Sequence, residues 1–435
     1  MTRNQLSRSV GGALVFLLLA ANLFVGARLY QQEGASRDRQ EAFENIQLFT
    51  RALEQIRLNY VDPERTSYHD LIYSGLQGML QSLDDHSQFM DPDMHRGMKD
   101  DTSGRFGGLG IVISHQDGVL TIVAPMENTP GFEAGLLPGD RIVEIEGEST
   151  ESMLLQDAVK RLRGDPGTPV TIRILRPKTR EMKELTIVRD RIRVPSVQNT
   201  EMVGDGIGYI RITQFNDPTG DALDRAIDEL MQQDMRGLVL DLRNNPGGLL
   251  SSAIDVSQRF LERGDLIVYT LGRDERQKQV FKARGRRRYL DFPMAILVNR
   301  GSASASEIVA GALQDHNRAI LVGEKTFGKG SVQSVIGMED GSAIRLTTAK
   351  YYTPRQRVIH ERGIEPDIFV PMDPDEWRRL LMHRNRPPNA EVELDPDSDA
   401  SGLVDVQLER AIDVLKGVMI FEASAGRDLM LSRRD

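Results

Sequence analysis

The chain has 435 residues, which is enough for two or three domains with hydrophobic cores of their own. Its net charge of −9 argues against a nucleic-acid-binding surface, because such a surface is normally basic. The sequence contains no cysteine, which excludes disulfides, thiolate metal sites and lipid attachment through cysteine. The lack of cysteine leaves the cellular compartment open.

The N-terminal segment predicts export. Arg3 and Arg8 precede an uncharged, apolar run over 9–27, whose length is near the ~20 residues that span a bilayer. Basic residues in front of such a run keep the N-terminus in the cytoplasm. We therefore expect residues 1–35 to anchor a single-pass cell-membrane protein whose remainder lies on the extracytoplasmic (periplasmic) side. The alternative is a signal peptide cleaved after Val25-Gly26-Ala27, which would leave a secreted or periplasmic protein.

Helices are expected at both ends of the remaining chain. In the N-terminal helical region, 36–104, apolar spacing predicts helices over about 38–60 and 67–83. The first helix carries an apolar stripe of Ile46, Phe49, Leu53 and Ile56. Residues 384–401 have a linker composition, and the tail over 402–435 has a second stripe of Leu408, Ile412, Leu415 and Met419. Each stripe could pack on its own domain or on a second copy, so a homodimer stays an alternative.

Residues 105–190 are expected to form a separate module. Strands are predicted near 111–113, 120–123, 142–145, 169–175 and 183–188, with a helix near 154–162. The run Gly108-Leu109-Gly110-Ile111 lets backbone N–H groups converge on a peptide carboxylate, and the adjoining strand edge can pair with the peptide. Together with Ala134–Ile142, which reads Ala-Gly-Leu-Leu-Pro-Gly-Asp-Arg-Ile, this run resembles a PDZ domain.

From residue 205 onward, apolar strands alternate with helices, which is typical of an α/β core. Strands are expected over 207–215, 238–242, 294–298 and 320–322, and helices over 218–233, 249–263 and 304–315. The core would comprise residues 191–383 together with 36–104. The predicted fold is thus multidomain, with a mixed α/β core, an inserted module and flanking helices.

Two short runs in this core suggest a serine–lysine site. Gly301–Glu307, Gly-Ser-Ala-Ser-Ala-Ser-Glu, follows an expected strand and opens a helix, where free backbone N–H groups favour a developing anion. Phe327–Gly330, Phe-Gly-Lys-Gly, offers a lysine whose burial would lower its pKa and let it act as a base toward Ser304. The N–H of Ala305 is a natural oxyanion donor. Gly247 or Gly248 could supply a second one, because glycine permits close backbone approach.

These runs resemble the carboxyl-terminal processing, or tail-specific, proteases, which are serine–lysine peptidases with an inserted PDZ domain. The resemblance covers about 41–372 and includes four further motifs, at Leu83–Phe89, Ile207–Ile212, Asp241–Gly248 and Gly363–Ile368. It implies that Ser304 is the nucleophile, that Lys329 is the base and that Gln333 supports the lysine. It also implies that the glycine turn, Gly247 and Gly248, belongs to the oxyanion hole. Asp315 is sometimes placed in a relay in this family. A carboxylate touching the lysine would raise its pKa, so a structural role is preferred here.

A Ser-His-Asp triad is the main chemical alternative. His316 lies twelve residues along the expected helix, about 18 Å from Ser304 at ~1.5 Å rise per residue, and so it cannot reach Ser304. His86 and His360 stay open as partners. The sequence has no metal-ligand spacing and no phosphate-binding glycine loop, so neither a metal nor a cofactor is expected.

The resemblance implies an endopeptidase that cleaves exported proteins near or upstream of their C-terminal tails. Its partners would be proteins or peptides with free C-terminal tails, recruited by the PDZ domain. Whether an activator or adaptor protein is needed stays open. The alternative is a catalytically silent, peptide-binding adaptor on the same fold, against which the joint presence of Ser304, Lys329 and Gln333 argues.

Overall fold

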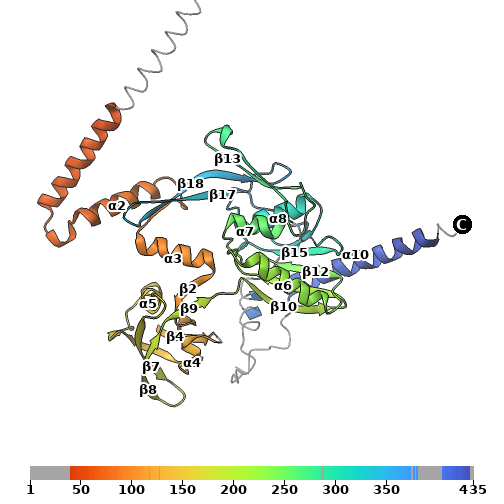
Figure 1. The fold of residues 1–435 in the computed structure, drawn as a ribbon, viewed down its shortest axis with the longest axis horizontal. Coiled ribbons are helices and arrows are strands. Elements are labelled where there is room, and N and C mark those ends of the chain that lie inside the picture. The colour runs from red at the N-terminus through yellow and green to blue at the C-terminus, as the bar shows by residue number, and fades with distance from the viewer. Residues whose placement is uncertain are drawn as a thin grey trace, which may run out of the picture. The chain divides into compact units, whose positions relative to one another are not determined.

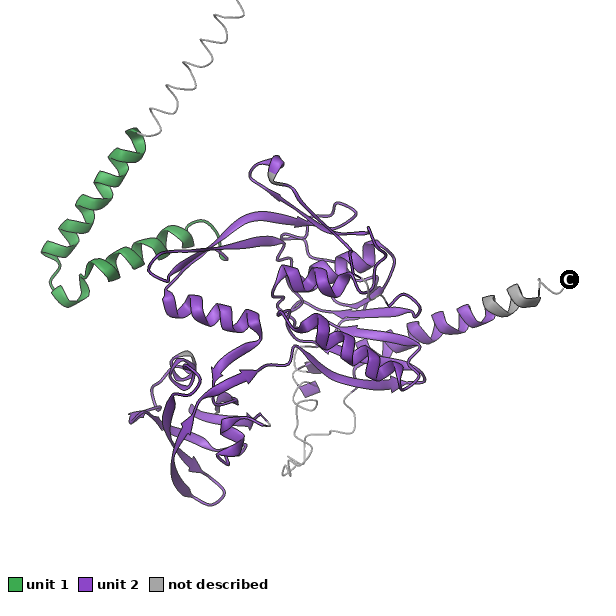
Figure 2. Ribbon diagram, in the orientation of Figure 1, with its two compact units in different colours: residues 1–85 green, residues 86–435 purple. Residues whose placement is uncertain are grey.

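The computed structural model describes residues 40–431, apart from 117, 127, 286–288, 374, 375, 378 and 381–403. The chain divides into two compact units, residues 1–85 and residues 86–435 (Figure 2). All of the residues expected to take part in chemistry or in peptide binding belong to the second unit.

The expected membrane localisation is corrected. In the described part of the chain, we find no helix whose length and apolar character would let it cross a bilayer. The first described helix, over 40–59, carries charges along its length, namely Glu41, Glu44, Arg51, Glu54 and Arg57. The run over 9–27, on which both the anchor and the cleaved signal were based, lies outside the described residues.

The first unit is helical where it is described. The helix over 40–59 is followed by the short η1 (Pro63–Arg65) and by α2 (Tyr68–Gln81). Ser67 caps α2, because its hydroxyl accepts the N–H of Asp70 at 3.0 Å. Both expected helices are therefore present. The stripe on the first helix is solvent-exposed, with Ile46 at 64% and Phe49 at 48% exposure.

The module over 105–190 is built on one antiparallel sheet. Its strand order is β3-β4-β5-β7-β8, and the short β6 (Glu148–Ser149) pairs with β5. The strands are β3 (Ile111–Gln116), β4 (Val119–Pro125), β5 (Arg141–Ile145), β7 (Pro169–Arg176) and β8 (Glu181–Val188). The helices are α4 (Pro130–Glu133) and α5 (Leu155–Leu162). β2 (Arg105–Gly108) pairs with β9 (Asp190–Arg193), so the chain enters and leaves the module side by side.

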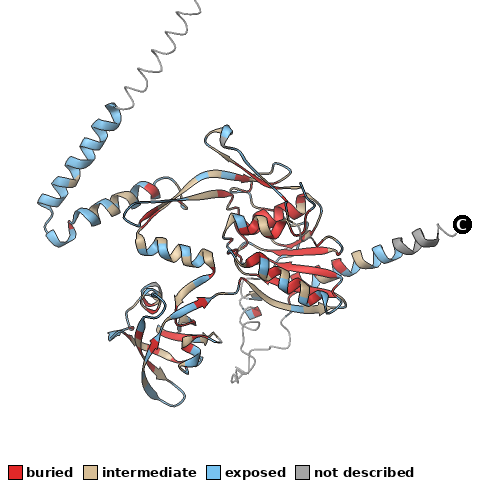
Figure 3. Cartoon of the chain, in the orientation of Figure 1, coloured by how far each residue is buried: buried red, intermediate tan, exposed pale blue. Residues whose placement is uncertain are grey.

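The core is organised around a six-stranded sheet with the order β10-β11-β12-β15-β16-β19. Figure 1 labels β10, β12 and β15 of this sheet. Only β10 runs antiparallel to its neighbour. The strands are β10 (Val197–Gly204), β11 (Ile207–Ile212), β12 (Gly237–Asp241), β15 (Met294–Val298), β16 (Ile320–Gly323) and β19 (Ile368–Phe369). The central strands are buried along their whole length, as parallel strands covered on both faces usually are (Figure 3).

Alternate strand residues face two different helical layers. Ile210, Leu240 and Ile296 belong to one apolar cluster with α6 (Thr219–Met231), α7 (Leu250–Ser257) and α8 (Ala305–Asp315). Tyr209, Val239 and Leu297 belong to a second cluster, with α10 (Val406–Leu431). The alternation follows from the two-residue repeat of a strand.

The stripe on the C-terminal tail packs on this second face. Leu408 and Leu415 are buried there, and Ile412 and Met419 pack against the same cluster. The homodimer alternative is therefore wrong for this stripe, because its own domain already covers the stripe.

A second sheet, in which all the strand pairs are antiparallel, differs from the sequence-based expectation. It comprises β1 (Gln88–Met90), β13 (Leu266–Gly272), β14 (Gln279–Lys282), β17 (Ser331–Gly337) and β18 (Ala343–Tyr352). The short η2 (Glu275–Gln277) precedes β14, and α3 (Pro92–Ser103) leads from β1 toward the module. The motif at Leu83–Phe89 thus runs into β1, which pairs with β18.

Candidate active site

Ser304 lies at a tight turn between a strand and a helix. β15 ends at Val298, and Ser304 is the N-cap of α8 with φ +55° and ψ −110°. Residues other than glycine rarely adopt positive φ, and such a conformation persists only where the surroundings enforce it. Here the Ser304 N–H donates to Glu307 Oε2 at 2.8 Å, and the N–H of Ala303 donates to the carbonyl of Asn245 at 2.9 Å.

The glycine turn lies against this serine. A Cβ on Gly247 would stand 2.8 Å from Ser304 Cβ and 2.9 Å from the nitrogen of Ala305. Only glycine fits here, and its φ of +102° also favours glycine. The Gly247 N–H donates to Asn245 Oδ1 at 2.9 Å, and Asn245 Nδ2 donates to the carbonyl of Ile212 at 2.8 Å. Gly248 makes no such backbone donation among the hydrogen bonds of the described residues.

Glu307 is a site residue that the sequence interpretation missed. Its buried carboxylate accepts four donors: the N–H groups of Ser304 (2.8 Å), Gly328 (2.7 Å) and Lys329 (2.9 Å), and the hydroxyl of Thr326 (2.5 Å). Burial raises the pKa of Glu307, and the four donors oppose that rise. The spacing of Ser304 and Glu307 is that of a capping box, which is a sequence signal that could have identified this residue.

Lys329 lies just before β17 and is half-buried. Burial lowers the pKa of the Lys329 amine, and the positive charge of Arg345 lowers that pKa further. Arg345 is held on β18 by the carbonyl of His86 at 3.2 Å and by Gln88 Oε1 at 2.9 Å. The described side chains show no hydrogen bond between the Lys329 amine and the Ser304 hydroxyl. The two residues are brought together through their backbones.

The side-chain oxygen of Gln333 is available to accept a hydrogen bond. Its Nε2 donates to Thr347 Oγ1 at 2.8 Å and to Ser331 Oγ at 3.1 Å. Its Oε1 is buried and has no hydrogen-bond partner among the described residues. A buried acceptor without a partner is unfavourable, so this oxygen is suited to receive an N–H from a neighbouring amine.

Asp315 and His316 make their hydrogen bonds with residues other than Ser304 and Lys329. Buried Asp315 accepts the N–H of Arg355 at 2.8 Å and pairs with the guanidinium of Arg357, which ties the end of α8 to the loop after β18. Nε2 of His316 lies 2.8 Å from the carbonyl of Leu266. These are the contacts of residues that hold elements together.

The glycine run of the module, residues 108–111, is shaped by close packing. A Cβ on Gly110 would stand 2.3 Å from Thr129 Cβ, and the φ of Gly110 is +71°. The carbonyl of buried Leu109 accepts the N–H of Gly131 at 2.7 Å. Gly108 ends β2, and Ile111 begins β3, which is the terminal strand of its sheet. The run therefore opens onto a strand edge that can accept an added strand.

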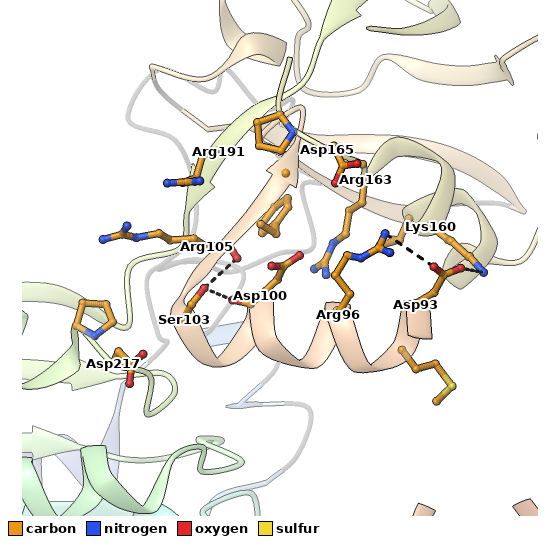
Figure 4. A pocket seen from close by; sticks show the side chains of 18 of the residues that line it. Asp93, Arg96, Asp100, Ser103, Arg105, Lys160, Arg163, Asp165, Arg191 and Asp217 are labelled. Atoms are coloured by element: carbon orange, nitrogen blue, oxygen red, sulfur yellow. Dashed lines mark hydrogen bonds and ion pairs between the residues drawn. The ribbon is translucent and has the colours of Figure 1, made fainter. Parts of the chain in front are cut away.

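A pocket of about 1010 Å³ lies between this module and the core (Figure 4). Neither Ser304 nor Lys329 lines it. Two ion pairs join its walls, Lys160 with Asp93 at 3.0 Å and Arg163 with Asp101 at 3.2 Å. The guanidinium of Arg163 also lies 4.4 Å from the ring centre of Phe106. Exposed pairs of this kind contribute little to stability, so they hold the module only weakly against α3.

Comparison with known proteins agrees with this architecture. Residues 206–370 match the model of peptidase family S41, and residues 121–176 match that of the PDZ domain. A carboxy-terminal-processing protease of Bartonella bacilliformis is 41% identical over 81% of this chain and 82% of its own. The carboxy-terminal processing protease CtpA of Bacillus subtilis is 38% identical over 73% of this chain and 67% of its own.

Among solved structures, a photosystem II D1 C-terminal processing protease covers 74% of this chain and 92% of its own, at 29% identity and a TM-score of 0.44. The sequence relatives decide the assignment, because they combine high identity with coverage of most of both chains. The chain belongs to the carboxy-terminal processing proteases of peptidase family S41, which carry a PDZ domain.

Proposed function

We propose that this protein is a serine endopeptidase that uses a Ser304–Lys329 dyad to cleave proteins near or upstream of their C-terminal tails. The observation that carries this proposal is the shared contact with Glu307. The N–H groups of Ser304 and Lys329 donate to the same oxygen, Oε2, at 2.8 and 2.9 Å. A nucleophile and a base fixed to one atom are held close together. The lowered pKa of Lys329 supports the base role, because the amine must be neutral to accept a proton.

In the proposed reaction, the neutral amine of Lys329 takes the hydroxyl proton of Ser304 as Oγ attacks the substrate carbonyl. The resulting oxyanion receives the N–H of Ala305 and a second N–H from the glycine turn. Gly248 is the preferred second donor, because the Gly247 N–H is already given to Asn245. The lysine then passes its proton to the leaving amine, which departs and leaves an acyl-enzyme on Ser304. In the second half of the reaction, Lys329 takes a proton from a water molecule as the water attacks the acyl carbon, and returns that proton to Ser304 Oγ.

Gln333 is proposed to orient the base. Its Oε1 is the buried acceptor without a partner described above, and a lysine N–H would satisfy it. Its amide end is fixed by Thr347 and Ser331, so the acceptor has a defined direction. This hydrogen bond would hold the Lys329 amine in an orientation in which its lone pair faces the Ser304 hydroxyl.

The PDZ domain is proposed to recruit substrates by their tails and to control access to the dyad. The glycine run over 108–111 and the edge of β3 support tail binding, since they offer backbone donors and a strand to extend. The weak ion pairs to α3 support movement of the domain, and a substrate tail can shift its position only through unequal affinity for two arrangements. In the arrangement that allows cleavage, the Ser304 hydroxyl and the Lys329 amine must lie within hydrogen-bonding distance so that the proton can be transferred.

The dyad is tested by incubating the full-length protein with an unfolded protein that ends in a free apolar tail. Ser304→Ala and Lys329→Ala should each abolish cleavage, and the double variant should be no worse than either single one, because the pair acts as a unit. Lys329→Arg should not restore cleavage, since arginine stays protonated. Lys325→Ala is the matched control, because that exposed lysine pairs with Glu365 at the surface and should be dispensable.

Cleavage that survives Lys329→Ala but is lost in His86→Ala or His360→Ala would replace the dyad with a histidine mechanism. Tail binding without any Ser304-dependent cleavage would instead indicate the silent adaptor.

A further inference from the structure

A fully buried arginine lies directly before the glycine turn. Arg243 is 0% exposed, although arginine is almost never buried without partners. All five N–H donors of its guanidinium have acceptors. Nε and Nη2 donate to Asp241 at 2.7–3.1 Å, Nη1 and Nη2 donate to Asp405 at 2.8 Å, and Nη1 also donates to Gln407 at 3.1 Å.

The acceptors come from two distant parts of the chain. Asp241 ends β12, two residues before Arg243, whereas Asp405 follows it by 162 residues and lies at the start of α10. Tyr209 donates its hydroxyl to Asp241 at 2.6 Å, and the ring of Trp377 lies 4.6 Å from the guanidinium. The start of the C-terminal helix is therefore fixed to the segment between β12 and the glycine turn.

The Arg243–Asp405 pair can influence the position of the glycine turn rather than touch the substrate. Arg243 is followed by Asn244 and Asn245, and Asn245 binds both Ile212 and Gly247. The backbone N–H of Arg243 also donates to Asp241 Oδ1 at 2.8 Å, so the side chain and the backbone share one anchor. A displacement of the guanidinium would carry the start of the turn with it.

We propose that Asp405 is a positioning residue for the oxyanion turn. It acts through Arg243 from the C-terminal helix, and this inference rests on the proposed function. Asp241 alone would leave three of the five guanidinium N–H donors, two on Nη1 and one on Nη2, without an anionic partner. An incompletely paired charge is unfavourable in a buried site. Asp405 completes the pairing and fixes the direction of the side chain. Gln407 supplies the last acceptor, and its own Nε2 donates to the carbonyl of Val370 at 2.8 Å.

Asp405→Asn is a suitable probe, because it removes the charge and keeps the size. Asp405 also caps α10, since Oδ1 accepts the N–H of Leu408 at 3.0 Å, and asparagine is an equally good cap. In the full-length protein, we expect kcat to fall about 10- to 100-fold with KM within about twofold, because small misplacements cost activity on this scale. A peptide boronic acid, which mimics the tetrahedral intermediate, should bind weaker by the same factor.

Leu415→Ala is the matched control. Leu415 is buried on the same helix and packs on the same sheet. It lies ten residues further along the chain than Asp405, which is about 15 Å at a rise of ~1.5 Å per helical residue. This variant should lower the melting temperature and leave kcat and the boronate affinity within about twofold of wild type. A purely structural role for Asp405 would make the two variants behave alike. Wild-type kcat or wild-type boronate affinity in a folded Asp405→Asn protein would overturn the inference.

If Asp405→Asn does not fold, Gln407→Met decides the question. It removes one neutral acceptor and leaves both carboxylates in place, and it should reduce kcat and boronate affinity together by a smaller factor, about 3- to 10-fold. Unchanged values would overturn the inference. If the wild-type protein shows no cleavage that depends on Ser304, the proposed function is overturned instead. The failure of the inference and the failure of the proposed function are therefore distinguishable.

Discussion

Ser304 and Lys329 are joined through a single atom, because both donate their backbone N–H groups to Oε2 of Glu307. Oε1 of the same carboxylate accepts Gly328 and Thr326. The start of α8 and the segment before β17 are thus fixed to each other at a buried charge. The geometry of the proposed dyad thus depends on Glu307, which is expected to touch no substrate.

Glu307→Gln should therefore reduce kcat by tenfold or more. The glutamine amide presents one acceptor and one NH₂ group, and the NH₂ group would face N–H donors. Loss of the charged hydrogen bonds should also lower the free energy of unfolding by about 1.5–3 kcal/mol. The measurements are steady-state cleavage and urea unfolding. Glu365→Gln, at an exposed carboxylate that pairs with Lys325, should change neither quantity measurably.

The rate should rise with pH and reach a plateau above the pKa of Lys329. Burial, and then the charge of Arg345, lower this pKa below the usual value of lysine, and the amine must be neutral to act as a base. Arg345→Gln removes a like charge, so the pKa should rise and the ascending limb of kcat/KM should move to higher pH. Arg345→Lys keeps the charge and should keep the profile. A profile that is identical in all three proteins would show that Arg345 does not tune the base.

Gly247→Ala should abolish cleavage. The added Cβ would stand 2.7 Å from the carbonyl of Ala303 and 2.8 Å from Ser304 Cβ, so the turn or the serine must move. Gly264→Ala is the control, because its φ of +101° nearly equals the +102° of Gly247 while its Cβ would meet nothing within 4 Å. Both variants should lose about 1–3 kcal/mol to backbone strain. Only the first should lose activity, as measured with a peptide substrate and by thermal unfolding.

Tail recognition should require the shape of the glycine run in the PDZ domain. A substrate with an amidated C-terminus should be cleaved more slowly than one with a free carboxylate, because the charge-assisted hydrogen bonds are lost. Gly110→Ala places a Cβ 2.3 Å from Thr129 Cβ and should abolish this preference. Gly118→Ala, at φ +75° with nothing within 4 Å, should retain it. Equal cleavage of both tails by the wild-type protein would contradict tail recognition.

Local patterns in the sequence predicted the core strands and the PDZ strands well. The strand over 294–298 and the helix that opens at Ser304 are both present, because continuous apolar runs and small-residue turns are strong local signals. The strand expected over 207–215 ends instead at Ile212, where the chain turns to let Phe215 meet the glycine turn. The expected membrane localisation was wrong.

The second sheet and the buried ion network could not be predicted in the same way. β17 and β18 are half-exposed and carry charged residues such as Arg345 and Lys350, so they lack an apolar strand pattern. The partner of Arg345, Gln88, is 257 residues away in sequence. Arg243 and Asp405 look like surface residues by type, and only the fold shows that they are buried together.

The placement of α10 has a consequence for the time at which the enzyme becomes active. The ribosome makes α10 after every strand of the sheet that the helix covers, because β19 ends at Phe369 and α10 begins at Val406. Until then, the face that carries Tyr209, Val239 and Leu297 has no cover, and Arg243 lacks Asp405. During synthesis, each domain generally folds as a unit as it emerges from the ribosome, and the N-terminal domains fold first. A partly synthesised chain would therefore contain Ser304 and Lys329 without the Arg243–Asp405 pair. Under the role proposed for Asp405, we expect such a chain to be less active than the complete protein.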